Sequence, residues 1–172
     1  MRSAAKCSGL GSFGDGSGRA MDYSAAMDDA AIDVLLIEWE KGQPAHERAD
    51  PMWGLVVYRL ARYALDASRR YAGALQRSGK PSCVDQLTRA VASISANVSE
   101  GYSRLTPADR ARYYAYALGS TREAISWYAS LRDALGDDTT NDRILVLSSL
   151  RRLLFGTLKS NQLSSHRSRF SP

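Results

Sequence analysis

The sequence predicts an all-α protein: an up-down-up-down antiparallel four-helix bundle with a disordered or partly helical N-terminal extension. Two observations predict this fold. Apolar residues recur at steps of three and four in four long segments, which is the pattern of amphipathic helices. The connections between these segments are short, so consecutive helices are expected to be antiparallel neighbours. No segment shows the alternation typical of a strand.

Residues 1–23 form a low-complexity tail rich in Gly and Ser. Such a chain buries too little apolar surface to offset the entropy lost on ordering. Gly9, Gly11 and Gly14 have the spacing of a dinucleotide-binding loop. That motif requires a strand before it and a helix after it, and the flanking residues indicate neither. We therefore assign the tail no ligand.

Residues 24–50 are predicted to be an acidic helix followed by a linker. The helix spans 24–41, and Gly42, Pro44 and Pro51 punctuate the linker. The residues at helical spacing are Met27, Ala30, Ala31, Val34, Leu35 and Glu38.

The four-helix bundle is expected over residues 51–162. Asp50 is a good N-cap and Pro51 suits the first position of the first helix. One apolar face runs along this helix through Trp53, Val56, Val57, Leu60, Ala64, Ala67, Tyr71 and Ala74. Ser82 is expected to cap the second helix, with Asp85 as the acid at its third position.

The third and fourth helices have similarly clear signals. Thr106 is a strong N-cap because Pro107 and Asp109 follow it, and this helix is expected to run to about Leu135. The "GDDTTN" stretch then ends it, and the fourth helix is expected from about Asn141. Residues 163–172 are interpreted as a basic tail.

The second helix carries a polar stripe beside its apolar seam of Leu87, Val91, Ile94 and Val98. Projection at about 100° per residue aligns the members of this polar stripe, which are Gln86, Arg89, Ser93, Asn97, Glu100 and Arg104. Gly101 lies between stripe and seam and permits close approach of another helix. The stripe is either a solvent face, a ligand site, or a hydrogen-bond network inside the bundle or between subunits.

The third helix offers a face that matches the polar stripe. Ser120 and Glu123 lie there beside aromatic side chains. A carboxylate in such surroundings requires a cation or an amide partner, and Arg89 or Asn97 is the expected partner of Glu123. Glu100 is expected to pair with Arg104, four residues further on.

Charge is unevenly distributed along the chain. Residues 1–50 contain five Lys+Arg against nine Asp+Glu, a formal charge of −4, and residues 51–172 contain eighteen against nine, a charge of +9. A basic body with an acidic front is typical of proteins that bind nucleic acid or another polyanion, and it also allows the front to lie on the body. The alternative is a solvated arginine-rich surface.

The sequence does not indicate an enzyme. Neither His46 nor His166 accompanies a nucleophile, no phosphate-binding loop is present, and no cofactor or metal is implied. Cys7 and Cys83 are too far apart for a disulfide framework, and we interpret them as free thiols. No apolar run approaches the length of a membrane span, so we expect a cytoplasmic protein without membrane contact.

The "QLTRAVASISANVSEGYSR" stretch (86–104) and "RYYAYALGSTREA" (112–124) resemble a bacterial family of four-helix-bundle proteins. These proteins are encoded in intervening sequences of large-subunit ribosomal RNA genes. The matching residues are Gln86, Leu87, Arg89, Ala90, Ser93, Ile94, Asn97, Val98, Glu100, Gly101, Gly119, Ser120 and Glu123. The resemblance covers about residues 52–160. It implies a homopentamer without established enzymatic activity, and a distant relation to the accessory variability proteins of diversity-generating retroelements.

Two functions follow as expectations. The first is a non-catalytic, oligomeric, basic accessory factor that binds the backbone of RNA or DNA. Its candidate contacts are Arg59, Arg62, Arg69, Arg70, Arg110, Arg112, Arg151 and Arg152. The alternative is a protein-protein adaptor or scaffold whose partner is, for example, a reverse transcriptase.

Overall fold

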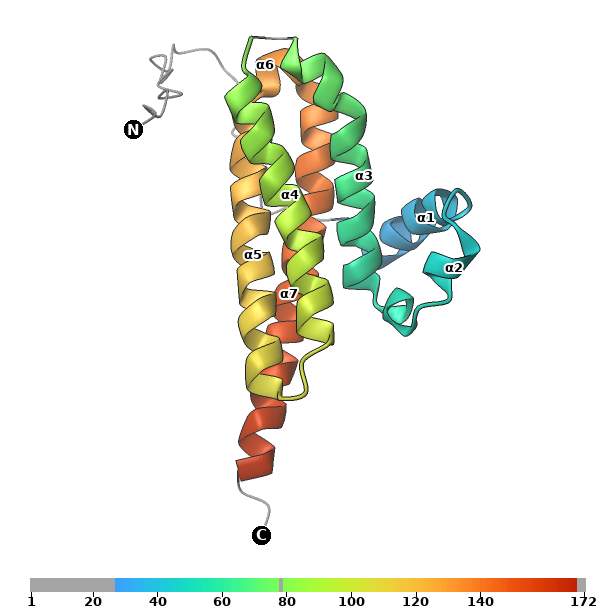
Figure 1. Cartoon of the computed structure of the whole chain (residues 1–172), viewed down its shortest axis with the longest axis vertical. Coiled ribbons are helices and arrows are strands. Elements are labelled where there is room, and N and C mark those ends of the chain that lie inside the picture. The colour runs from blue at the N-terminus through green and yellow to red at the C-terminus, as the bar shows by residue number, and fades with distance from the viewer. Residues whose placement is uncertain (1–26, 78, 170–172) are drawn as a thin grey trace, which may run out of the picture.

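The computed structural model describes residues 27–77 and 79–169, and every regular element in those residues is a helix (Figure 1). The elements are α1 (Asp29–Glu40), α2 (Ala45–Arg48), the 3₁₀ helix η1 (Pro51–Gly54), α3 (Val56–Gln76), α4 (Pro81–Tyr102), α5 (Pro107–Ser130), α6 (Arg132–Leu135) and α7 (Asp137–Arg169). In this part of the chain, no helix is long and apolar enough to cross a membrane. The Gly9–Gly14 spacing and Cys7 lie outside the described residues.

The four long helices α3, α4, α5 and α7 lie side by side (Figure 1). The contacting pairs are α3 with α4, α4 with α5, α5 with α7, and α7 with α3, so the four enclose one core. The predicted seam of α4 is confirmed, because Val91, Ile94 and Val98 are each 0% exposed. Each such side chain contributes about 1.5–3 kcal/mol through burial of its apolar surface.

The start of α5 forms as predicted. The Thr106 hydroxyl accepts a hydrogen bond from the Asp109 backbone N–H (3.1 Å) and donates one to the Asp109 carboxylate (2.8 Å). Pro107 occupies the first turn, where its missing N–H leaves no helical hydrogen bond unmade. α5 ends at Ser130, and the short α6 completes the stretch to Leu135. Gly136 has a φ of 81°, and α7 begins directly after it.

Two predicted helix starts are wrong. Asp50 accepts a hydrogen bond from the Met52 backbone N–H, but the element that it caps is η1. The backbone is extended at Leu55, and α3 begins only at Val56. α4 begins at Pro81 after Lys80, which makes no side-chain cap. Proline is favoured at the first helical position, so Ser82 is already inside the helix and does not cap it.

The residues before α3, here called the front segment (27–54), pack beside α3 (Figure 1). The acidic helix is confirmed as α1, but the face expected from its spacing is only partly right. Met27 and Leu35 pack against the core as expected, whereas Val34 is 64% exposed. The fully buried residues are Ile32 and Leu36, each 1% exposed. Helical periodicity alone could not identify the buried face in a helix with apolar residues on several sides. The expected linker contains the short helix α2.

The last helix is longer than its sequence signals indicate. α7 begins at Asp137, four residues before the expected start at Asn141. It continues without interruption to Arg169, across the expected boundary between bundle and tail at 162/163. Asp137 and Asp138 lie in its first turn, where negative charge interacts favourably with the helix dipole.

Candidate functional site

One hydrogen bond joins the polar stripe of α4 to α5 within one chain, and a second residue of the stripe supports it. The Asn97 side-chain amide donates to the Ser93 carbonyl oxygen (2.8 Å) and to Ser93 Oγ (3.0 Å). Ser93 Oγ lies 3.0 Å from Ser120 Oγ. All three side chains are half-buried. At this point the stripe therefore belongs to a hydrogen-bond network between two helices of the same chain, which is one of the alternatives left open by the sequence.

Gly101 permits the close approach expected from its position. A Cβ atom at Gly101 would lie 2.8 Å from Tyr114 Cε1 and 3.2 Å from Tyr113 Cβ, both on α5. The φ angle of Gly101 is not positive, so its backbone conformation does not require glycine. Glycine is required because the space between α4 and α5 is too narrow for a side chain.

The predicted ion pair between Glu100 and Arg104 is present next to Gly101. The Arg104 guanidinium also lies over the Tyr113 ring, 4.6 Å from its centroid.

The expected partner of Glu123 is wrong. Its carboxylate accepts a hydrogen bond from Trp127 Nε1 (3.3 Å) on the same helix, and not from Arg89 or Asn97. Glu123 is exposed, so water can solvate its charge and no buried cation is needed. Gln86 and Arg89 are exposed at the other end of the stripe.

Replacing Asn97 with alanine is expected to lower the free energy of unfolding by about 1 kcal/mol, because it removes two hydrogen bonds from a half-buried network. Chemical denaturation of the purified variant would measure this change. Gln86→Ala is the matched control, since it removes an exposed side-chain amide from the same helix. Equal stability of the two variants would contradict a structural role for the network.

Two of the expected nucleic-acid contacts are instead occupied by the front segment. Arg59 donates a hydrogen bond to Glu40 (2.7 Å) and Arg62 donates one to Glu47 (2.7 Å). Their side chains are only 21% and 25% exposed. Both arginines are thus ion-paired and partly covered. This outcome matches the other possibility raised by the uneven charge, an acidic front that lies on the basic body.

Aromatic and polar contacts hold the front segment as well. The Trp39 ring stacks on Trp53 with centroids 5.6 Å apart, and its Nε1 donates to Asp66 of α3 (3.1 Å). At the other end, Arg152 of α7 donates to the Asp29 carboxylate (2.8 Å). The Met27 backbone N–H donates to Ser149 Oγ (2.7 Å). The front segment therefore contacts both α3 and α7.

The remaining candidate arginines differ in how accessible they are. Arg70 is exposed and forms no ion pair with any described residue. Arg69 is 65% exposed and lies 3.8 Å from Asp66, and Arg112 is 55% exposed and lies 3.2 Å from Asp109. Arg151 is half-buried. Arg110 is half-buried and donates to the Arg104 carbonyl oxygen (3.1 Å).

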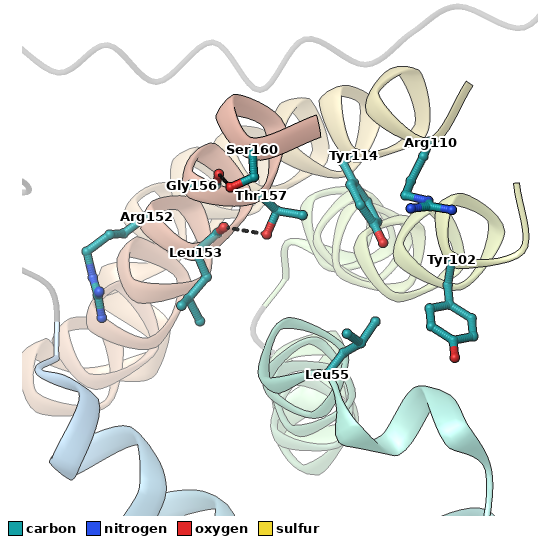
Figure 2. Close-up of a pocket in the computed structure, with 9 residues that line it drawn as sticks. All are labelled: Leu55, Tyr102, Arg110, Tyr114, Arg152, Leu153, Gly156, Thr157 and Ser160. Atoms are coloured by element: carbon teal, nitrogen blue, oxygen red, sulfur yellow. Dashed lines mark hydrogen bonds between the residues drawn. The ribbon is translucent and has the colours of Figure 1, made fainter. Parts of the chain in front are cut away.

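An open groove of about 960 Å³ lies where α3 stops short of its neighbours (Figure 2). Figure 1 shows that α4, α5 and α7 extend beyond the end of α3 at which Val56 lies. The groove is lined by Leu55, by Tyr102 at the end of α4, by Arg110 and Tyr114 of α5, and by one face of α7 from Arg152 to Ser160. We call it the terminal groove.

Sequence reasoning missed Tyr102 and Tyr114 as site residues. Both lie next to the motifs that were recognised, but nothing in the local pattern distinguishes them from core or surface tyrosines. Burial is the main reason that the pKa of Tyr114 lies above its ordinary value, and the nearby charge of Arg110 opposes this rise.

Across the described residues, no group of three His, Cys, Asp or Glu side chains is arranged to hold a metal ion.

Comparison with known proteins gives one match. A model of the family described as 23S rRNA-intervening sequence protein matches residues 54–152. The matched stretch starts just before α3 and ends within α7, so it contains the polar stripe and leaves out α1 and α2. No curated protein and no solved structure was found to match the chain.

Proposed function

The chain belongs to the 23S rRNA-intervening sequence protein family, and we propose that it is a non-catalytic accessory protein that binds the RNA backbone. The family's name links it to ribosomal RNA. The observation that carries the proposal is the exposed arginine pair Arg69 and Arg70 on α3: Arg70 has no acidic partner among the described residues, and Arg69 has only a distant one. Exposed guanidinium groups bind phosphate with little desolvation cost and no base specificity.

The net charge supports the same function. The sequence from residue 51 onward carries a formal charge of +9, and the front segment neutralises only part of it, at Arg59, Arg62 and Arg152. Such a surface attracts polyanions and raises their association rate. The proposed function does not involve catalysis.

We further propose that α3, α4, α5 and α7 form an up-down-up-down bundle and that the protein assembles as a homopentamer, as the resemblance implies. The pattern of neighbouring helices supports the first point. The second is supported by Tyr116, which is 54% exposed on α5, packs edge-on against Tyr113 and would be covered in an assembly. Native mass spectrometry should give five times the mass of one chain, and a monomer would contradict the pentamer.

Replacing both Arg69 and Arg70 with glutamine is expected to weaken binding of a single-stranded RNA by about tenfold. The salt dependence should also become shallower. For single strands, each phosphate bound by the protein contributes about 0.7 to the slope of log affinity against log salt, so removing two such arginines changes the slope by about 1.4. Fluorescence anisotropy of a labelled oligonucleotide over a salt series would measure both quantities.

The matched control is the double variant Arg59→Gln, Arg62→Gln. It removes the same charge from the same helix, but from arginines that are paired with Glu40 and Glu47. We expect it to change RNA affinity by less than the Arg69, Arg70 variant. Equal losses would point to net charge alone, and no binding by the wild-type protein at low salt would remove the proposed function.

A protein adaptor is the second candidate, and one observation favours it. The outward side of α1 exposes two apolar side chains, Val34 at 64% and Ile37 at 57%. Apolar side chains that stay exposed together on one helix often mark a surface that binds another protein. Replacing both with serine should then abolish copurification of a specific protein partner while leaving RNA binding unchanged. Retention of that partner by the variant would argue against this surface.

A further inference from the structure

Two arginines, Arg110 and Arg152, line the terminal groove, and among the described residues no Asp or Glu side chain does. The half-buried Arg110 guanidinium donates through Nη2 to the Arg104 carbonyl oxygen and forms no ion pair with a described residue. Arg152 is already paired with Asp29. Arg110 is therefore the lining arginine whose charge is left for an anionic ligand.

Two tyrosines add aromatic surface and polar groups to the same space. Tyr102 is the last residue of α4 and is 40% exposed, so its ring is accessible to a planar ligand. Figure 2 shows the Tyr114 hydroxyl pointing into the space near Arg110. Within the described residues, neither tyrosine hydroxyl makes a hydrogen bond. Tyr114 is 3% exposed, so the accessible aromatic surface at this end of the groove is the Tyr102 ring, with the half-buried Arg110 guanidinium behind it.

The opposite wall supplies apolar contact. Leu55 approaches from the start of α3 and Leu153 from α7 (Figure 2). A ligand that suits the groove therefore combines an anionic group for Arg110 with a flat, partly apolar ring for Tyr102 and the leucines. A phosphate joined to a nucleobase has both. A volume of about 960 Å³ is within the range of small-molecule sites and is sufficient for a nucleotide.

We propose that the terminal groove binds one unpaired nucleotide of single-stranded RNA, with its phosphate on Arg110 and its base stacked on Tyr102. This inference rests on the proposed RNA-binding function and identifies a second, distinct contact for it. Aromatic stacking of an unpaired base is the usual way in which proteins hold single strands, because every base presents a π-face. A base within a duplex cannot reach Tyr102, so the groove favours single strands over duplexes.

The direct test uses adenosine 5′-monophosphate and the full-length ¹⁵N-labelled protein. NMR titration should shift the amide signals of the residues that line the groove. Adenosine, which lacks the phosphate, and inorganic phosphate, which lacks the base, should each bind at least fivefold more weakly. If inorganic phosphate binds as well as the nucleotide, the groove is a simple anion site. That result, or shifts located elsewhere, would overturn the proposal.

Substitutions identify which groups carry the binding. Tyr102→Ala should weaken binding of the nucleotide by about tenfold, as expected for loss of one stacked base, and Tyr102→Phe should retain most of it. Arg110→Gln should weaken it by a similar factor. The matched controls are Phe155→Ala and Arg122→Gln, an exposed aromatic residue of α7 and an exposed arginine of α5 that do not line the groove. Equal effects of control and test variants would contradict the assignment.

The same variants separate this inference from the proposed function. Arg69→Gln with Arg70→Gln should weaken RNA binding and leave nucleotide binding unchanged. Tyr102→Ala should weaken binding of single-stranded RNA more than that of a duplex. If the wild-type protein binds RNA but Tyr102→Ala and Arg110→Gln do not affect it, the groove proposal fails and the function stands. Tyr102 is exposed, so its variants should fold, and thermal unfolding would verify this.

Discussion

Replacing Gly101 with alanine is expected to lower the free energy of unfolding by about 2 kcal/mol. The new Cβ atom would lie 2.8 Å from Tyr114 Cε1 and 3.0 Å from Cδ1, closer than van der Waals contact allows. The Tyr114 ring is only 3% exposed, so it cannot move aside without disturbing its neighbours. Overpacking of this kind typically costs about 1–3 kcal/mol. Chemical denaturation with circular dichroism would measure the change.

Gly119→Ala is the matched control, and the expected sign is opposite. Gly119 is an exposed glycine in the middle of α5, and a Cβ atom there meets nothing within 4 Å. Alanine is favoured over glycine in a helix by about 1 kcal/mol, so this variant should be more stable than the wild type. A stabilised Gly101→Ala variant would contradict the close approach of α4 and α5 at this point.

Replacing Trp39 with alanine is expected to detach the front segment and to lower the free energy of unfolding by about 3 kcal/mol. The substitution removes the stacking on Trp53, the edge contact with Tyr63 and the hydrogen bond to Asp66. Hydrogen exchange followed by mass spectrometry should then show faster exchange in residues 27–50 than in α4 and α5. Denaturation would measure the change in stability.

Val34→Ala on the same helix tests whether the effect is specific. Its side chain is 64% exposed, and the variant should match the wild type in stability and in exchange of the front segment. Protection of residues 27–50 that survives Trp39→Ala would show that the ion pairs of Arg59 and Arg62 hold the segment by themselves. These two pairs keep contact with solvent, at 21% and 25% exposure of the arginine side chains. Ion pairs that water can reach seldom contribute more than about 1 kcal/mol, so we expect the aromatic contacts to dominate.

Several parts of the structure were predictable because they depend on neighbours along the chain. The Thr106 cap and the Glu100–Arg104 pair each join residues about one helical turn apart, and consecutive residues of the α4 seam are also about one turn apart. Ser93 and Asn97 were also placed correctly on one line. The sequence predicted that this line faces Ser120, and in the structure Ser93 makes that contact.

Other parts were decided by contacts between residues far apart in the sequence. Periodicity showed that α1 is a helix, but the buried side of α1 depends on how it packs against α3. From the sequence alone, Arg59 and Arg62 were expected to be exposed on the surface. They pair with Glu40 and Glu47 because the front segment packs against α3. The expected pairing of Glu123 failed because exposure to water removed the need for a cation.

The sequence by itself determined the all-helical class, the main helices and the small-residue contact at Gly101, since helix formation and amphipathicity are local properties of the chain. The tertiary structure decided which arginines are covered and created the terminal groove. The groove exists because α3 begins at Val56, while α4, α5 and α7 extend further. Relative helix ends depend on how whole elements pack, and no short stretch of sequence encodes them.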